Sequence, residues 1–295
     1  KSSSEPPHVI APAASAIFST RAERFDQLAA GHSLGDWLRF LGALSHAQHA
    51  ALQSLPALPL PDATQLALAR EHRMPPLPAQ SWPRDPAWRT GLQQIIAAVT
   101  PAAPEPARKD LARLATFDAE RVEALAERVL HTELYGDDAA LLPYVAAALQ
   151  VLWTAGAARL GVAEIAALDV PGVCPCCGFL PVASVVRGGG EVANLRYLHC
   201  ALCNTEWNLV RVKCTACDAT EGVSYRHLEA EGIKGADAVR AETCDSCKSY
   251  LKIVYQEKGP VDPVADDLAT LALDILVDEA GYARSGPNLL LVPGG

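Results

Sequence analysis

The first 170 residues carry the hydrophobic spacing of α-helices. Apolar residues recur at intervals of three and four along residues 37–44, and residues 33–36 before them have the composition of an N-cap and first turn. Residues 110–134 repeat the pattern, with charged residues between the apolar ones. Residues 141–160 are almost wholly apolar, which predicts the central helix of a bundle with Pro143 in its first turn or at a kink. We therefore expect an all-α helical domain over residues 1–170.

Proline marks the connections between these helices. Residues 56–61 and 75–88 hold eight of the 22 prolines, which predicts extended segments rather than helices. Residues 100–106 form another such linker, and residues 1–12 have the composition of a frayed end. No apolar run approaches the length of about 20 residues that a membrane span needs, so a soluble protein is expected.

The pattern changes at Pro171-Gly172 to short strand-like runs. These runs cover residues 180–186, 192–199, 206–213, 223–228, 238–242 and 250–256. The order of features repeats over 171–213 and 214–258, which predicts two tandem β modules. An acidic amphipathic helix follows over about 263–279, within a C-terminal segment of 259–295. The expected fold class is therefore α+β and multi-domain, with a helical domain, two metal-stapled β modules and a C-terminal helix.

The cysteines give the strongest chemical signal. All nine lie between Cys174 and Cys247, and eight form Cys-x-x-Cys pairs. The pairs are Cys174/Cys177, Cys200/Cys203, Cys214/Cys217 and Cys244/Cys247. A two-residue gap lets both thiolates of a tight turn point at one ion, and two such turns complete a tetrahedral shell. We therefore predict two four-cysteine metal sites with these eight ligands.

Two pairings of the Cys-x-x-Cys turns, or knuckles, are open. Consecutive pairing joins the first turn to the second and the third to the fourth, and interleaved pairing joins the first to the third and the second to the fourth. We favour consecutive pairing because each half of the segment then repeats the other. A disulfide network is the alternative to metal, although clustered pairs in a long chain favour metal binding.

The residue after each knuckle's second cysteine bears on the backbone of the turn. Gly178 is suited to the left-handed conformation of a rubredoxin or zinc-ribbon knuckle. Asn204 and Asp218 tolerate a positive φ, and Lys248 does so less readily. The fourth knuckle is therefore expected to be the least ideal.

Other candidate ligands carry less weight. Cys176 is spare, and can be a packed bystander, an alternative ligand or a redox-active thiol. His46 and His49 are spaced to meet one ion on a helix, but no third ligand is evident. His199 fits a supporting or surface role better than ligation. A four-sulfur shell suits zinc and mononuclear iron equally in geometry, and general occurrence favours zinc.

Charge argues against nucleic acid as the partner. The net charge is -9, and residues 174–258 contain ten basic and ten acidic residues, before any thiolate is counted. Nucleic-acid binders normally present a basic surface to phosphates. The sequence also shows no phosphate-binding loop, nucleophile elbow or acid/base pair, so an ordinary enzyme is not expected.

With these features in view, the chain resembles the FdhE family of formate dehydrogenase accessory proteins. The likeness spans nearly the whole chain. It rests on Leu34-Gly35-Asp36-Trp37-Leu38-Arg39-Phe40-Leu41, Cys174-Pro175-Cys176-Cys177-Gly178, the block 200–217, Cys244-Asp245-Ser246-Cys247, and the tail from Asp266-Asp267-Leu268-Ala269-Thr270-Leu271 through Gly281-Tyr282.

The resemblance implies a cytoplasmic maturation factor that acts on the catalytic subunit of a respiratory formate dehydrogenase. It also implies rubredoxin-like iron at the Cys-x-x-Cys motifs, which moves iron ahead of zinc. Two other functions stay open on the residues alone. One is a zinc-ribbon protein that binds nucleic acid or another partner, and the other is a small electron-transfer or thiol-redox protein. The sequence does not define the oligomeric state.

Overall fold

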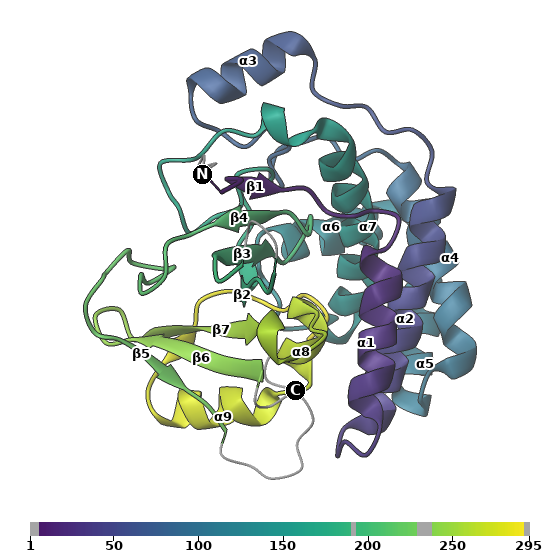
Figure 1. Ribbon diagram of the computed structural model, residues 1–295. Coiled ribbons are helices and arrows are strands. Elements are labelled where there is room, and N and C mark those ends of the chain that lie inside the picture. The colour runs from purple at the N-terminus through teal and green to yellow at the C-terminus, as the bar shows by residue number, and fades with distance from the viewer. Residues whose placement is uncertain (1–5, 190–192, 229–237, 292–295) are drawn as a thin grey trace.

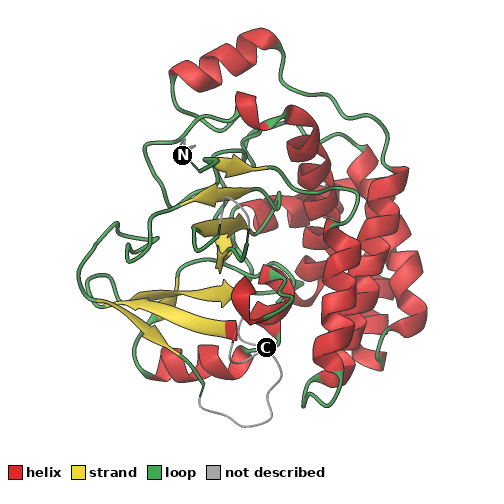
Figure 2. Cartoon of the chain, viewed as in Figure 1, coloured by secondary structure: helices red, strands yellow, loops and turns green. Residues whose placement is uncertain are grey.

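The computed structural model describes residues 6–189, 193–228 and 238–291, and it places a helical layer beside a sheet (Figures 1 and 2). The helices of the first part are α1 (Ile17–Ala29), α2 (Gly35–Ser54), α3 (Ala63–Glu71), α4 (Ala87–Val99), α5 (Glu105–Leu114), α6 (Ala119–Leu130) and α7 (Leu142–Leu160). Single 3-10 turns cover Thr100–Ala102, Ala139–Leu141 and Val162–Glu164. The mixture of an N-terminal helical region and a strand-rich C-terminal region confirms the predicted fold class.

Helix α7 is the centre of the bundle, as its apolar sequence predicted. It packs against α2, α4 and α6, and Pro143 occupies its first turn, where a missing N–H costs nothing. With the turn before it, this helix is long and apolar enough to cross a membrane, contrary to the expectation that no run reaches that length. Its neighbours bury it almost completely, which is typical of a core helix.

The predicted helical stretch over 110–134 is two helices rather than one. Helix α5 ends at Leu114, and the Asp118 side chain accepts a hydrogen bond from the backbone N–H of Arg121 to begin α6. Asp118 itself lies in the extended region, with φ -71° and ψ 172°, so the helical ladder cannot run through it. The linker over 100–106 is also partly helical, because α5 begins at Glu105.

All eight strands that the structure describes belong to one sheet. They are β1 (Val9–Ile10), β2 (Pro181–Val186), β3 (Arg196–Cys200), β4 (Glu206–Asn208), β5 (Val223–Arg226), β6 (Val239–Cys244), β7 (Ser249–Tyr255) and β8 (Ala283–Arg284). The order is β1-β4-β3-β2-β7-β6-β5, with β8 beside β7. The predicted run at 206–213 is a strand only over its first three residues, and Val192 lies outside the described residues.

The two halves of the cysteine-bearing region are joined by a parallel strand pair. Strand β2 pairs with β7 from Ser184 opposite Ile253 to Val186 opposite Tyr255. Each half contributes three antiparallel strands in the same order, β4-β3-β2 and then β7-β6-β5. The internal repeat is therefore visible as two similar sheets fused edge to edge.

The chain before α1 is not frayed where the structure describes it. Val9 pairs with Trp207 and Ile10 with Glu206, which adds β1 to the edge of the sheet. The Tyr197 hydroxyl also donates to the Pro7 carbonyl at 2.9 Å. Residues 1–5 of the predicted frayed end lie outside the described residues.

The predicted acidic helix is two short helices, α8 (Pro263–Leu268) and α9 (Leu271–Glu279). Between them, the Thr270 hydroxyl donates to the Asp266 carbonyl at 2.8 Å, a local bond that competes with the helical ladder. Helix α8 lies between α1 and the strands β2 and β7 (Figure 1). The segment therefore fills the seam between the helical layer and the sheet.

Four acidic residues of this segment, Asp262, Asp266, Asp267 and Asp274, form internal ion pairs, whereas Asp278 and Glu279 are exposed. Asp262 pairs with Arg21 at 3.1 Å, and Asp266 pairs with Arg24 at 2.6 Å, both from α1. Asp267 is fully buried between Lys252 and Arg284. Burial raises the pKa of Asp267, but the charges of Arg284 and Lys252 outweigh this effect and hold the pKa below its ordinary value. The tail folds back as well, because Leu289 and Leu290 are buried in the core.

Candidate metal centres

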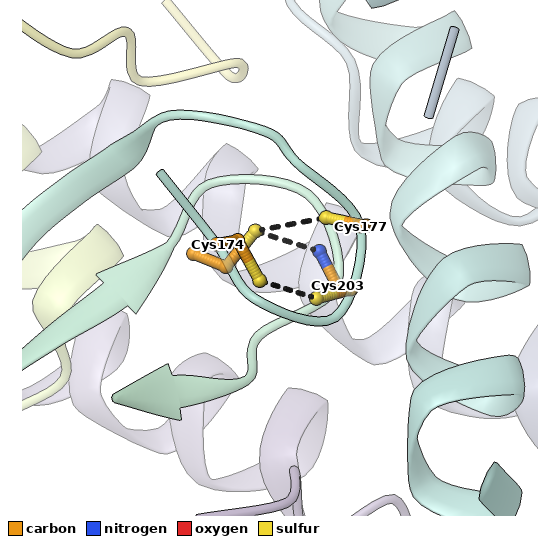
Figure 3. Close-up of side chains that lie close together, drawn as sticks. Cys174, Cys177 and Cys203 are labelled. Carbon is orange, nitrogen blue, oxygen red and sulfur yellow. Dashed lines mark hydrogen bonds between the residues drawn. The ribbon is translucent and has the colours of Figure 1, made fainter. Parts of the chain in front are cut away.

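The first group of cysteines comes from two loops that face each other. Cys174 and Cys177 precede β2, Cys200 is the last residue of β3, and Cys203 lies in the turn that follows. The Sγ atoms of Cys174 and Cys203 are 3.5 Å apart, and those of Cys177 and Cys200 are also 3.5 Å apart (Figure 3). All four sulfurs lie within 4.8 Å of one another and are buried. We call these residues the first cluster.

The second cluster repeats this arrangement at the other half of the sheet. It consists of Cys214, Cys217, Cys244 and Cys247. The Sγ atoms of Cys214 and Cys247 are 3.7 Å apart, as are those of Cys217 and Cys244. The structure thus groups the sulfurs by consecutive pairs, not by the interleaved pattern. Cys214 and Cys244 are buried, whereas Cys217 and Cys247 are exposed.

The spacing of the sulfurs fits a tetrahedral metal site. Four metal–sulfur bonds of 2.3 Å at tetrahedral angles put the sulfurs about 3.8 Å apart. The distances of 3.5–3.7 Å are close to this value and far from the bond of about 2.05 Å in a disulfide. All nine cysteines lie in the described part of the chain, and all nine are free thiols. The donor set therefore fits a thiophilic divalent ion in both clusters.

Backbone N–H groups point at the sulfurs as they do in metal-binding knuckles. The N–H groups of Leu202 and Cys203 donate to Cys200 Sγ at 3.4 Å, and that of Ala216 donates to Cys214 Sγ at 3.4 Å. Such bonds orient a thiolate and spread its charge. All four residues that follow the second cysteines have positive φ: Gly178 at 74°, Asn204 at 58°, Asp218 at 66° and Lys248 at 53°. Lys248, which was expected to adopt this conformation least readily, does so like the other three.

The electrostatics of the first cluster also suit a cation. Burial raises the pKa of the Cys174 and Cys177 thiols well above their ordinary value. Burial also raises the pKa of the Cys203 thiol, but hydrogen bonds from Cys174 and the neighbouring thiols outweigh it. The pKa of Cys203 is therefore well below its ordinary value. Four buried thiolates would repel one another, and a divalent ion among them offsets that repulsion.

The helical layer seals the first cluster. The proline-rich segment after α3 lies along the first knuckle, where Leu77 N–H donates to the Cys176 carbonyl at 3.0 Å and Ala79 N–H donates to the Cys177 carbonyl at 2.8 Å. From α7, Gln150 donates to the Ala201 carbonyl at 2.7 Å. The cluster's four cysteines belong to the main hydrophobic core, together with the bundle helices.

A buried polar network extends from the first cluster to α1. The Asn204 Oδ1 atom accepts from Arg21 Nη2 at 2.7 Å and from His199 Nε2 at 3.0 Å. On the other side of the ring, His199 Nδ1 lies 3.0 Å from Glu206 Oε1. Arg21 also pairs with Asp262, the N-cap of α8. One fully buried arginine thus ties together the helical domain, the second knuckle and the C-terminal segment.

Different residues support the second cluster. Arg196 is buried in the sheet and donates to the Lys213 carbonyl at 2.9 Å, which holds the chain directly before Cys214. Tyr282 donates to Asp245 at 2.7 Å, inside the fourth knuckle. Lys248 pairs with Asp245 at 2.9 Å and lies over the Tyr282 ring. These contacts stabilise Lys248 in its left-handed conformation.

The remaining candidates are not part of either cluster. Cys176 is fully buried in the first knuckle but is not one of the four converging sulfurs. His46 is exposed on α2, and within the described ranges neither it nor His49 belongs to a group of potential ligands.

Arg21 is a structural residue of this site that was not predicted from the sequence. The signal was present, because Arg21 lies between Phe18, Ala22 and Phe25 on the buried stripe of α1. A charged residue on such a stripe predicts a buried ion pair.

Comparisons with known proteins agree with one another. Family models of FdhE match in three consecutive parts, the N-terminal domain at residues 6–168, the central domain at 173–211 and the C-terminal domain at 212–291. The FdhE homologue of Pseudomonas aeruginosa is 40% identical and covers 98% of this chain and 94% of its own. The homologue of Edwardsiella ictaluri is 45% identical over 94% of this chain and 89% of its own.

A solved structure shows the same similarity in three dimensions. The crystal structure of the FdhE protein from Pseudomonas aeruginosa superposes with a TM-score of 0.84 at 38% identity. The match covers 98% of this chain and 100% of that one. The chain therefore belongs to the FdhE family, a family of formate dehydrogenase accessory proteins rather than enzymes.

Proposed function

We propose that this protein binds the catalytic subunit of a respiratory formate dehydrogenase in the cytoplasm and is required for that enzyme's activity. The observation that carries the proposal is the match to all three FdhE domains along one chain that also holds two four-cysteine clusters. A binding factor for a protein is also consistent with the acidic net charge of -9, which disfavours nucleic acid.

Each cluster in this proposal holds one metal ion, with the eight clustered cysteines as ligands. The sulfur spacing and the N–H···S bonds support that role. We infer iron of the rubredoxin type, as the resemblance to the FdhE family implies. Zinc is the alternative, because tetrahedral thiolates accept both ions. When bound, either ion neutralises thiolates and crosslinks two loops, and the small sheet halves gain folding free energy from it.

The partner is tested by co-purification under anaerobic conditions. The tagged protein is expressed with the formate dehydrogenase catalytic subunit, and formate oxidation is measured in cells with and without it. We expect the subunit to co-purify and the activity to require this protein. Absence of the subunit from the eluate, together with unchanged activity in its absence, would contradict the proposal.

The metal sites are tested by adjacent cysteine substitutions. Cys176→Ser and Cys177→Ser alter neighbouring, fully buried cysteines, but only Cys177 belongs to the first cluster. We expect two metal equivalents in the wild type and in Cys176→Ser, and about one in Cys177→Ser. Elemental analysis with an absorption spectrum gives both the stoichiometry and the metal. Equal metal loss in the two variants would contradict the assignment of the ligands.

A further inference from the structure

The two clusters differ sharply in their access to solvent. In the first cluster Cys174, Cys200 and Cys203 are 0% exposed and Cys177 is 1% exposed. In the second cluster Cys214 and Cys244 are buried, but Cys217 and Cys247 are exposed. Half of the second sulfur shell is therefore open to solvent, and none of the first is.

The cover over the first cluster is built from long-range contacts. Its loops bond to Leu77, Ala79 and Gln150 of the helical domain, and through Asn204 to Thr154 and Arg21. Solvent reaches these sulfurs only when the helical layer separates from the sheet, which breaks buried hydrogen bonds and opens the main core. Opening of this kind has a free energy close to that of global unfolding.

The second cluster lacks a comparable cover among the described residues. Its strands pack on a separate, smaller core of Val185, Val239, Ala241, Tyr250, Val254, Leu273, Val277 and Tyr282. The cluster lies where β6 turns into β7, at the end of these strands that points away from the helical layer (Figure 1). Contacts to its knuckles come from Tyr282, from the Gly172 backbone, from Arg196 at the Lys213 carbonyl and from the Ala283 N–H at the Lys248 carbonyl, and none of them belongs to the helical layer. Local fluctuation of one knuckle is enough to expose the ion.

From this asymmetry we infer that the second cluster is the exchangeable metal site of the protein and the first is a permanent structural centre. The inference rests on the proposed metal binding of both clusters. A thiophilic divalent ion leaves and enters the second cluster through Cys217 and Cys247, because an incoming ligand can reach their sulfurs without disturbing the fold. The first ion stays in place as long as the helical layer remains docked.

Chelator competition tests the inference directly. Wild-type protein loaded with two zinc equivalents is mixed with excess 4-(2-pyridylazo)resorcinol, and the coloured complex is followed with time. We expect two phases of one equivalent each, with rates that differ at least tenfold. Release of both equivalents in a single phase would overturn the inference.

Alkylation identifies the cluster that opens first. Iodoacetamide is present during the fast phase, and the labelled cysteines are identified by mass spectrometry of peptides. We expect label at Cys217 and Cys247 while the first cluster stays unlabelled, since free thiolates react once the ion leaves. Earlier label at Cys174, Cys177, Cys200 or Cys203 would reverse the assignment. This measurement uses the wild type and does not depend on the folding of a variant.

Two matched substitutions complete the experiment. Cys247→Ser is expected to abolish the fast phase and to leave a slow phase of one equivalent. The first-cluster substitution Cys177→Ser is expected to remove the slow phase, with loss of helical-domain stability. Wild-type binding of fewer than two equivalents contradicts the proposed metal centres and, with them, this inference. Binding of two equivalents with a single release rate contradicts the inference alone.

Discussion

Partly exposed charged side chains also hold elements of this protein together, and Glu123 is an example. Glu123 of α6 accepts from Arg84 Nε at 2.8 Å, from Trp88 Nε1 at 2.9 Å and from Arg89 Nη1 at 2.6 Å. Partial burial raises the pKa of Glu123, but the hydrogen bonds from Arg84, Arg89 and Trp88 outweigh it. The pKa of Glu123 is therefore below its ordinary value of 4.5. One carboxylate of α6 thus binds both the loop before α4 and the first turn of α4.

Replacement of this carboxylate gives a prediction with a defined pH dependence. Glu123→Gln is expected to lower the free energy of unfolding at pH 7 by about 1 kcal/mol, since three charge-assisted bonds weaken at a partly exposed site. A folded pKa below the unfolded one gives stability that is present above pH 4.5 and is lost as the pH falls through the folded pKa. The difference between wild type and variant in urea unfolding should therefore close below pH 4.5.

The control for this prediction is Glu133→Gln. Glu133 is exposed and takes part in no recorded ion pair among the described residues. We expect Glu133→Gln to unfold at the same urea concentration as the wild type at pH 7. A gap for Glu123→Gln that stays constant down to pH 3 would show that the carboxylate's charge is not what stabilises this contact.

Individual helices and strands show which features a sequence can predict. Helix α7 and the strand cores were predictable because apolar periodicity depends only on neighbouring residues. The break before α6 was signalled by Asp118, a good N-cap inside an otherwise helical pattern. The burial of the acidic segment against α1 was not predictable, because Asp262 pairs with Arg21, which lies 241 residues away in the chain. The eight clustered cysteines could be predicted from their spacing in the sequence, but the residues that cover them could not.

The docking of α1 on α8 depends on a buried ion pair. Arg21→Ala removes a fully buried guanidinium and leaves Asp262 unpaired, so we expect a loss of about 3–5 kcal/mol in the free energy of unfolding. Arg39→Ala is the matched control, because Arg39 pairs with Asp36 on the exposed surface of α2. That variant should lose less than about 1 kcal/mol. Equal urea midpoints for the two variants would contradict a structural role for Arg21.

At the scale of the whole molecule, one glycine joins the two metal-binding halves. A Cβ atom on Gly172 would lie 2.0 Å from the carbonyl oxygen of Thr215, which belongs to the third knuckle. Gly172 itself precedes the first knuckle, so the entry to the first cluster packs directly on the second. The linker and the third knuckle must therefore stay in close contact.

Gly172→Ala is expected to displace the third knuckle and weaken metal binding at the second cluster only. Overpacking of this kind costs about 1–3 kcal/mol, which corresponds to weaker binding by roughly 5- to 150-fold. Chelator titration should show a weaker second equivalent and an unchanged first. Gly91→Ala in α4 is the control, because its Cβ would meet nothing within 4 Å and alanine favours a helix. If both variants bind metal like the wild type, the Gly172 contact is not important for the second cluster.

The parallel pairing of β2 with β7 also has a consequence for synthesis on the ribosome. Ser184 emerges 69 residues before its partner Ile253, a delay of about 3–14 s at common translation rates. During that interval the fully buried strand β2 has one open edge, a template for association with other chains. A nascent chain that stalls before residue 249 would keep that edge exposed. Strand β7 therefore protects the newly made protein from aggregation as well as completing its sheet.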